Sequence, residues 1–154
     1  MAAFVLWWAL LVGLPSQQTA PASNASAASA ASASSASLDF EFFKTKVQPI
    51  FLTKRPGLAR CAACHASVTA PAVFQLQPLA PGSTTWTEDQ AHKNFEAASR
   101  LVIAGNVKSP LLMHPLAEDA GGDFFHSGGK QFHSQDDAEW QTLKAWVLGQ
   151  SAGR

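Results

Sequence analysis

The run Cys61-Ala62-Ala63-Cys64-His65 constrains the fold of this 154-residue chain more than any other feature of its sequence. It contains the only two cysteines of the chain, and a histidine follows the second one directly. On a short helical segment the two thiols lie one turn apart, which lets them form thioethers with the two vinyl groups of one haem. His65 is then carried beneath the ring plane, where its imidazole can be the proximal iron ligand. The run therefore predicts one covalently attached haem c around which the chain must fold.

Other chemistries also use two cysteines at this spacing, namely a disulfide, a non-haem dithiol oxidoreductase and half of a tetrahedral zinc site. A thioredoxin-type pair lies within alternating strands and helices, and the sequence has no such alternation. A zinc site needs two more ligands at short spacing, whereas the other histidines are scattered over positions 92, 114, 126 and 133. Haem is therefore favoured, and a dithiol oxidoreductase remains an alternative.

The first 37 residues contain no charged side chain. Residues 3–14 form an apolar run that is too short to span a bilayer, and small residues follow it, so residues 1–21 are expected to be a secretory signal peptide. No Lys or Arg precedes the apolar run, which leaves an uncleaved anchor as the alternative. Residues 22–37 are almost entirely Ala and Ser and predict a linker. Export agrees with the cysteine motif, because haem is attached outside the cytoplasm. The sequence therefore predicts a periplasmic or otherwise exported protein. Membrane tethering through its N-terminal segment is left open.

A folded domain is expected over residues 38–149, with residues 150–154 as a C-terminal tail. Apolar residues at helical spacing predict three helices, over residues 39–51, 88–103 and 136–148. The intervening stretches are rich in Pro and Gly and show no strand pattern, so they are expected to be long loops. The aromatic and aliphatic stripe of the last helix is expected in the core.

Local signals place the helix ends. Pro49 should kink or tighten the first helix. Thr87 and Gln90 form a capping box before the second. Ser134 is the expected N-cap of the third helix, and Gly149 should end it.

The order of helix, Cys-x-x-Cys-His, loop, helix, loop and helix resembles the class I cytochrome c fold over residues 38–149. The segments VQPIF, CAACH, HSGGKQF and DDAEWQTLKAW look like single-haem cytochrome domains of planctomycete and acidobacterial proteins. The resemblance implies an all-α fold in which three main helices and long loops wrap one covalent haem. It also implies an electron carrier, not an enzyme, that transfers one electron at a time between redox partners.

The ligand on the other face of the iron decides the function. In class I cytochromes this ligand usually lies in the loop before the last helix, which favours His126, and the glycines that follow it would let the backbone turn tightly. Met113 is the alternative distal ligand. His114 is a further candidate, either for the iron or for a haem propionate. An open distal position would instead indicate a haem sensor or a peroxidase-like protein.

The resemblance also implies a proline carbonyl that orients His65, for which Pro71 and Pro78 are candidates. His92 and His133 are expected on the surface. Trp86 and Arg100 are also expected there, and binding of the haem propionates is their alternative role. The chain carries 11 basic and 11 acidic residues, and it has no basic aromatic stretch, so nucleic acid is not an expected partner. Basic residues precede the cysteine motif and acidic residues gather between positions 118 and 137, which is compatible with docking to redox partner proteins.

Overall fold

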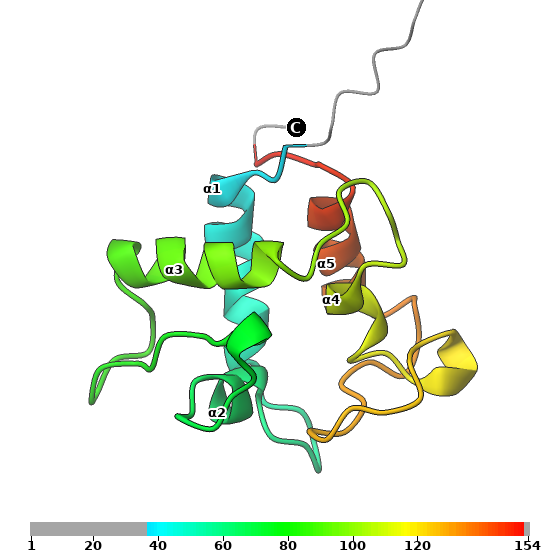
Figure 1. The fold of residues 1–154 in the computed structure, drawn as a ribbon, viewed down its shortest axis with the longest axis horizontal. Coiled ribbons are helices and arrows are strands. Elements are labelled where there is room, and N and C mark those ends of the chain that lie inside the picture. Colours follow the sequence, from blue (N-terminus) through cyan, green and yellow to red (C-terminus); the bar gives the residue numbers. More distant parts are fainter. Residues whose placement is uncertain (1–36, 153–154) are drawn as a thin grey trace, which may run out of the picture. The chain divides into compact units, whose positions relative to one another are not determined.

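The computed structural model of the protein describes residues 37–152. The expected signal peptide over residues 1–21 lies outside the described residues, as do nearly all of the expected linker and the last two residues of the tail. Among the helices of residues 37–152, none is both long enough and apolar enough to cross a bilayer. The described segment consists of short helices joined by loops (Figure 1), in the order α1 Phe40–Phe42, η1 Phe43–Val47, η2 Gln48–Leu52, α2 Cys61–His65, η3 Ala72–Phe74, α3 Glu88–Ser99, α4 Pro110–Met113, η4 Glu118–Ala120 and α5 Ala138–Val147.

The first three of these elements form one continuous helical segment whose hydrogen-bond pattern changes along its length. The Asp39 carboxylate accepts the Phe42 N–H at 2.6 Å and caps the start of the segment. The α-turn of α1 is followed by the π-helix η1 and then by the 3₁₀-helix η2, in which Pro49 is near the first position. Proline lacks the N–H that a continuing α-helix needs. The predicted helix over residues 39–51 is thus confirmed, with a tighter winding around Pro49.

The second predicted helix is confirmed as α3, and so is its capping box between Thr87 and Gln90. It ends at Ser99, four residues before the predicted end at Ile103. Beyond this end the chain is held in a turn by Ser109, a fully buried residue whose hydroxyl accepts the Ile103 N–H at 2.9 Å and donates to the Asn106 carbonyl at 2.7 Å. This local hydrogen bonding takes the backbone around residue 103 out of the helical path.

The third predicted helix is confirmed as α5, but its predicted N-cap was wrong. Asp137 caps the helix, because its carboxylate accepts the N–H groups of Glu139 and Trp140. The Ser134 hydroxyl instead accepts the Asp136 N–H at 3.0 Å, in the turn before the helix. Ser134 and Asp137 are both suitable N-cap residues, and the sequence pattern alone did not show which of them caps the helix.

Within residues 37–152 the structure contains helices and loops but no strand, which confirms an all-α class. A single isolated bridge joins Leu116 and Phe132. The helix α4 was not predicted, although Pro110 after Ser109 is a recognised start signal. In Figure 1, α3 lies across the N-terminal helical segment, and the two are in contact.

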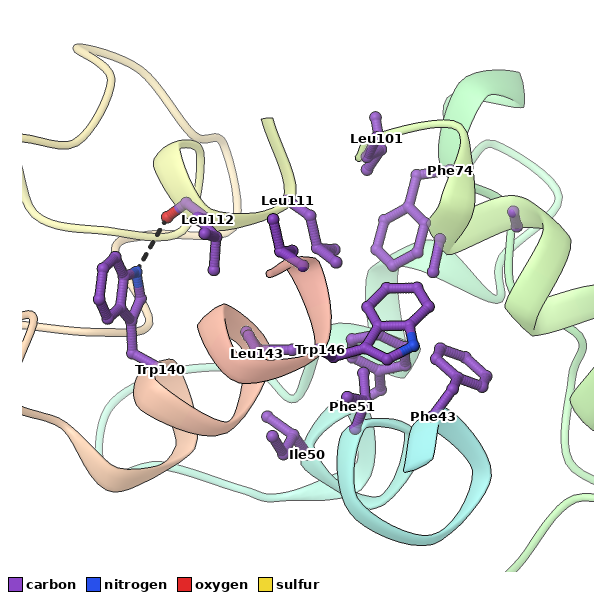
Figure 2. Packing of buried hydrophobic residues seen from close by; sticks show 14 of the residues in the cluster. Phe43, Ile50, Phe51, Phe74, Leu101, Leu111, Leu112, Trp140, Leu143 and Trp146 are labelled. Carbon is purple, nitrogen blue, oxygen red and sulfur yellow. Dashed lines mark hydrogen bonds between the residues drawn. The ribbon is translucent and has the colours of Figure 1, made fainter. Parts of the chain in front are cut away.

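The core is dominated by aromatic side chains (Figure 2). Trp146 is fully buried, and its ring centroid lies 5.1 Å from that of Phe43 and 5.8 Å from that of Phe95. Trp140, also buried, donates its indole N–H to the Leu112 carbonyl at 3.2 Å. The helix α5 is therefore fixed both to the N-terminal helical segment and to α4, and the predicted core stripe of the last helix is confirmed.

The surface position predicted for Trp86 was wrong. Its side chain is buried and its indole N–H donates to the Gln77 carbonyl at 2.7 Å. This internal acceptor satisfies the one polar atom of the ring, so the rest of the side chain can be buried.

Candidate cofactor site

A cavity of ≈ 370 Å³ opens between α2, α4, α5 and the loop that precedes α5. Its volume is in the range of sites that hold small molecules and cofactors. Most of its lining is apolar, and aromatic and aliphatic side chains from several elements contribute to it, among them Phe51, Phe74, Leu101, Leu111 and Leu143. The polar exceptions include the two cysteines and three of the histidines of the chain.

The helix α2 presents both cysteines and the histidine of the motif to this cavity. Cys61, Cys64 and His65 all line it, and both cysteines are free thiols. Cys64 is exposed, whereas Cys61 is partly buried against the hydrophobic core. Burial raises the pKa of the Cys61 thiol, and the nearby positive charge of Arg55 opposes this shift. The two thiols therefore share one helix but differ in their surroundings.

The imidazole rings of His65 and His126 face each other across the cavity. Their centroids lie 6.2 Å apart and their planes differ by 19°. When two imidazoles bind one metal ion from opposite sides at metal–nitrogen distances of about 2 Å, their centroids lie on the order of 6 Å apart. The separation therefore leaves room for one metal ion between the two rings.

Each of these two rings is oriented by a main-chain carbonyl. His65 Nδ1 donates to the Phe74 carbonyl at 3.0 Å, and His126 Nδ1 donates to the Gly129 carbonyl at 2.7 Å. Nε2 is then the nitrogen left on each ring to bind a metal. Histidines that bind metals usually have such a partner on the second nitrogen, because it fixes the tautomer and the ring orientation.

The carbonyl that orients His65 comes from Phe74, and the prediction of Pro71 or Pro78 was wrong. The Pro71 carbonyl accepts the Phe74 N–H at 2.9 Å, within the turn that becomes η3. The Pro78 carbonyl accepts the side-chain amide of Gln90 at 2.9 Å. Phe74 also packs its ring near that of His65, with centroids 4.6 Å apart.

The electrostatics of His65 favour its neutral form. Burial lowers the pKa of its imidazole, and the nearby His126 lowers it further, while the hydrogen bond to the Phe74 carbonyl partly offsets both effects. A neutral imidazole is the form that binds metals, because protonation occupies the lone pair.

His126 lies in a tight turn that depends on glycine. The Gly129 N–H donates to the His126 carbonyl at 2.9 Å, and Gly129 has a positive φ of 79°. A Cβ atom at Gly128 would lie 3.3 Å from the His126 ring. The glycines after His126 thus allow the backbone to fold back against its imidazole, as the sequence predicted.

The other candidate ligands do not face His65 as His126 does. Met113 is buried among hydrophobic residues and is absent from the cavity lining. His114 lines the cavity, is exposed, and pairs through Nδ1 with the carboxylate of Asp123. His92 and His133 are exposed, as predicted. Over residues 37–152, no three or more His, Cys, Asp or Glu side chains converge on a potential metal site.

Two residues near His126 were not among the predicted site residues. Gln131 lines the cavity and is 3 % exposed, and its side-chain amide donates to the Gly128 carbonyl at 3.2 Å. Arg55 contacts Gln131 from outside the cavity. The only sequence signal for Gln131 was its place as a polar residue beside the apolar Phe132. No sequence pattern linked Gln131 to Arg55.

Comparison of the chain with protein-family models, with curated protein sequences and with solved structures gives no match.

Proposed function

We propose that this protein is an exported monohaem c-type cytochrome that transfers single electrons between redox partners. The observation that carries the proposal is the pair of imidazoles, His65 and His126, which face each other at 6.2 Å with both Nδ1 atoms bonded to main-chain carbonyls. Two such imidazoles on opposite sides would complete a six-coordinate haem iron, in addition to its four porphyrin nitrogens. The proposed fold around this group is that of class I cytochromes c.

The residues that would hold the haem are those that meet at the cavity. Cys61 and Cys64 would supply the two thioether bonds, His65 the proximal ligand and His126 the distal ligand. When bound, the haem supplies an iron that cycles between the ferric and ferrous states, and so accepts or releases one electron. The chain contributes binding, orientation and burial, which are the usual contributions of a protein to cofactor chemistry.

The proposed ligand pair has consequences for the potential. A methionine ligand raises the reduction potential, so two histidines indicate a carrier with a lower potential than His/Met cytochromes. Most of the cavity lining is apolar, which would place the haem in surroundings of low polarity. Because His65 and His126 would both hold the haem iron, no position would remain open for a substrate, and the proposed role is that of an electron carrier and not of an enzyme.

A second, more open groove of ≈ 660 Å³ adjoins the start of α2. It is lined by residues 54, 57–60 and 63, and its only charged residues are the exposed Lys54 and Arg60. Because the groove adjoins the cysteine motif, a redox partner with an acidic surface could dock there close to the haem. Partners of this kind are steered by charge, so the rate of electron exchange should fall as ionic strength rises.

Optical spectroscopy of the full chain, produced in a host that exports it and attaches haem, tests the proposal. We expect a low-spin spectrum in both oxidation states, together with haem-dependent staining of the band on a denaturing gel. Replacement of both cysteines by alanine should abolish the staining. A colourless product with bound zinc, or one with a reducible dithiol and no haem, would contradict the proposal.

A further inference from the structure

Arg55 has three partners in the part of the chain after residue 130. Its guanidinium pairs with the carboxylate of Glu139 in the first turn of α5, and its side chain is only 12 % exposed. Its Cζ atom lies 4.7 Å from the ring centroid of Phe132, and Nη1 donates to the side-chain carbonyl of Gln131 at 3.4 Å. The planar guanidinium of an arginine can donate to two acceptors at once, and a lysine ammonium bridges two acceptors less well.

Gln131 continues this chain of contacts to the turn that carries His126. Its amide donates to the Gly128 carbonyl at 3.2 Å, and Gly128 lies between His126 and the Gly129 carbonyl that holds the imidazole. Leu58 supports the same turn by packing, because a Cβ atom at Gly129 would lie only 2.8 Å from its Cδ2. The segment from Arg55 to Leu58 therefore braces the turn at residues 126–129.

On its N-terminal side the turn follows Asp123, whose N–H donates to the Met113 carbonyl at 3.0 Å and whose carbonyl accepts a hydrogen bond from the Lys130 ammonium. Phe124 and Phe125, which precede His126, are 83 % and 71 % exposed. On the C-terminal side the chain is fixed again from Phe132 onward, whose N–H donates to the Pro115 carbonyl at 3.0 Å. The two exposed residues before His126 add few contacts, so the position of its ring depends on the anchored residues on both sides and, through Gln131, on Arg55.

We infer that Arg55 is a positioning residue for His126, which it holds toward the haem iron through Gln131 and Gly128. The inference rests on the proposed function, since it concerns the distal ligand of that same site. Arg55 slows the departure of His126 from the iron, and so keeps external ligands away from the distal position.

Carbon monoxide binding to the reduced holoprotein tests this. At saturating carbon monoxide the rate of the spectral change equals the rate at which His126 leaves the iron. Because carbon monoxide is uncharged, its binding does not respond directly to the loss of the Arg55 charge. We expect Arg55→Met and Gln131→Met each to raise this rate about tenfold, as loss of one hydrogen bond to a charged group predicts. The double variant should be no faster than the faster single one, because both residues belong to one chain of contacts. Lys93→Met, which removes an exposed cation on α3, is the control and should behave as the wild type.

Arg55→Lys separates positioning from simple stability. It keeps a cation beside Glu139, so its melting temperature should approach that of the wild type, while its carbon monoxide rate should remain raised. A wild-type rate in Arg55→Lys and in Gln131→Met would overturn the inference, even if Arg55→Met failed to fold. A tenfold effect from each variant that multiplied in the double variant would overturn the proposed chain of contacts. Absence of a low-spin spectrum in the wild type would instead overturn the proposed function itself, together with the role of Arg55.

Discussion

The indole N–H of Trp146 donates a 2.9 Å hydrogen bond to the main-chain carbonyl of Asp39 and so joins the last helix to the residue that caps the first. The same carbonyl also accepts the Phe43 N–H at 3.1 Å. This hydrogen bond links the N-terminal helical segment to α5, and we call these two linked elements the frame. Neither His65 nor His126 lies on the frame.

Trp146→Phe should therefore destabilise the frame without changing the site. It removes one hydrogen bond and part of a buried ring, while the Asp39 carbonyl keeps its second donor, so we expect a loss of about 1–3 kcal/mol in the free energy of unfolding. Chemical denaturation of the holoprotein measures this loss. Phe124→Leu, at an exposed position, should change stability by less than about 0.5 kcal/mol. Equal effects of the two variants would contradict the importance of the frame.

His126→Ala should convert the low-spin haem to a high-spin form, because it removes the proposed distal ligand. His114→Ala is the matched control, since His114 also lines the cavity but is paired with Asp123. We expect electron paramagnetic resonance of the ferric protein to show a high-spin signal for His126→Ala only. A low-spin spectrum that survives in His126→Ala and disappears in His114→Ala would reassign the ligand.

Met113→Leu should leave both the spectrum and the reduction potential unchanged. Met113 is buried among hydrophobic residues away from the cavity lining, and exchange of Met for Leu conserves volume, so stability should change by less than about 1.5 kcal/mol. Redox titration of the variant checks the potential. A marked fall in potential would show that the thioether binds the iron.

The two cysteines of the haem-free chain should react at different rates with iodoacetamide. The thiolate is the reactive form, and burial raises the pKa of Cys61, so its thiolate fraction near pH 8 is below that of an ordinary cysteine. Cys64 is exposed and should be alkylated first, and the reaction of Cys61 should catch up as the pH rises. Mass spectrometry of the digested chain at a series of pH values measures both sites. Equal rates at every pH would contradict the difference in environment.

Structural features that depend on residues close together in the sequence were predicted well. The capping box at Thr87, the tightening around Pro49 and the glycine turn after His126 all depend on contacts between residues a few positions apart. Such contacts leave a pattern in the sequence because the backbone geometry that links them is nearly fixed.

Features that depend on tertiary contacts were missed or misplaced. The partner of His65 is a main-chain carbonyl, which every residue has, so no residue type marked Phe74 in advance. Trp86 became a core residue because the Gln77 carbonyl was available to its indole. The pairing of Arg55 with Glu139 joins positions 84 residues apart, and only the folded chain brings them together.

The facing histidines also have a topological consequence. A metal ion shared by His65 and His126 would close the chain between these positions into a ring, as a disulfide does. By the entropy of loop closure, a link across a ring of this size restricts the unfolded chain by about 4 kcal/mol. In the unfolded chain, departure of the distal imidazole would release this cross-link, so ligand loss and unfolding would be coupled.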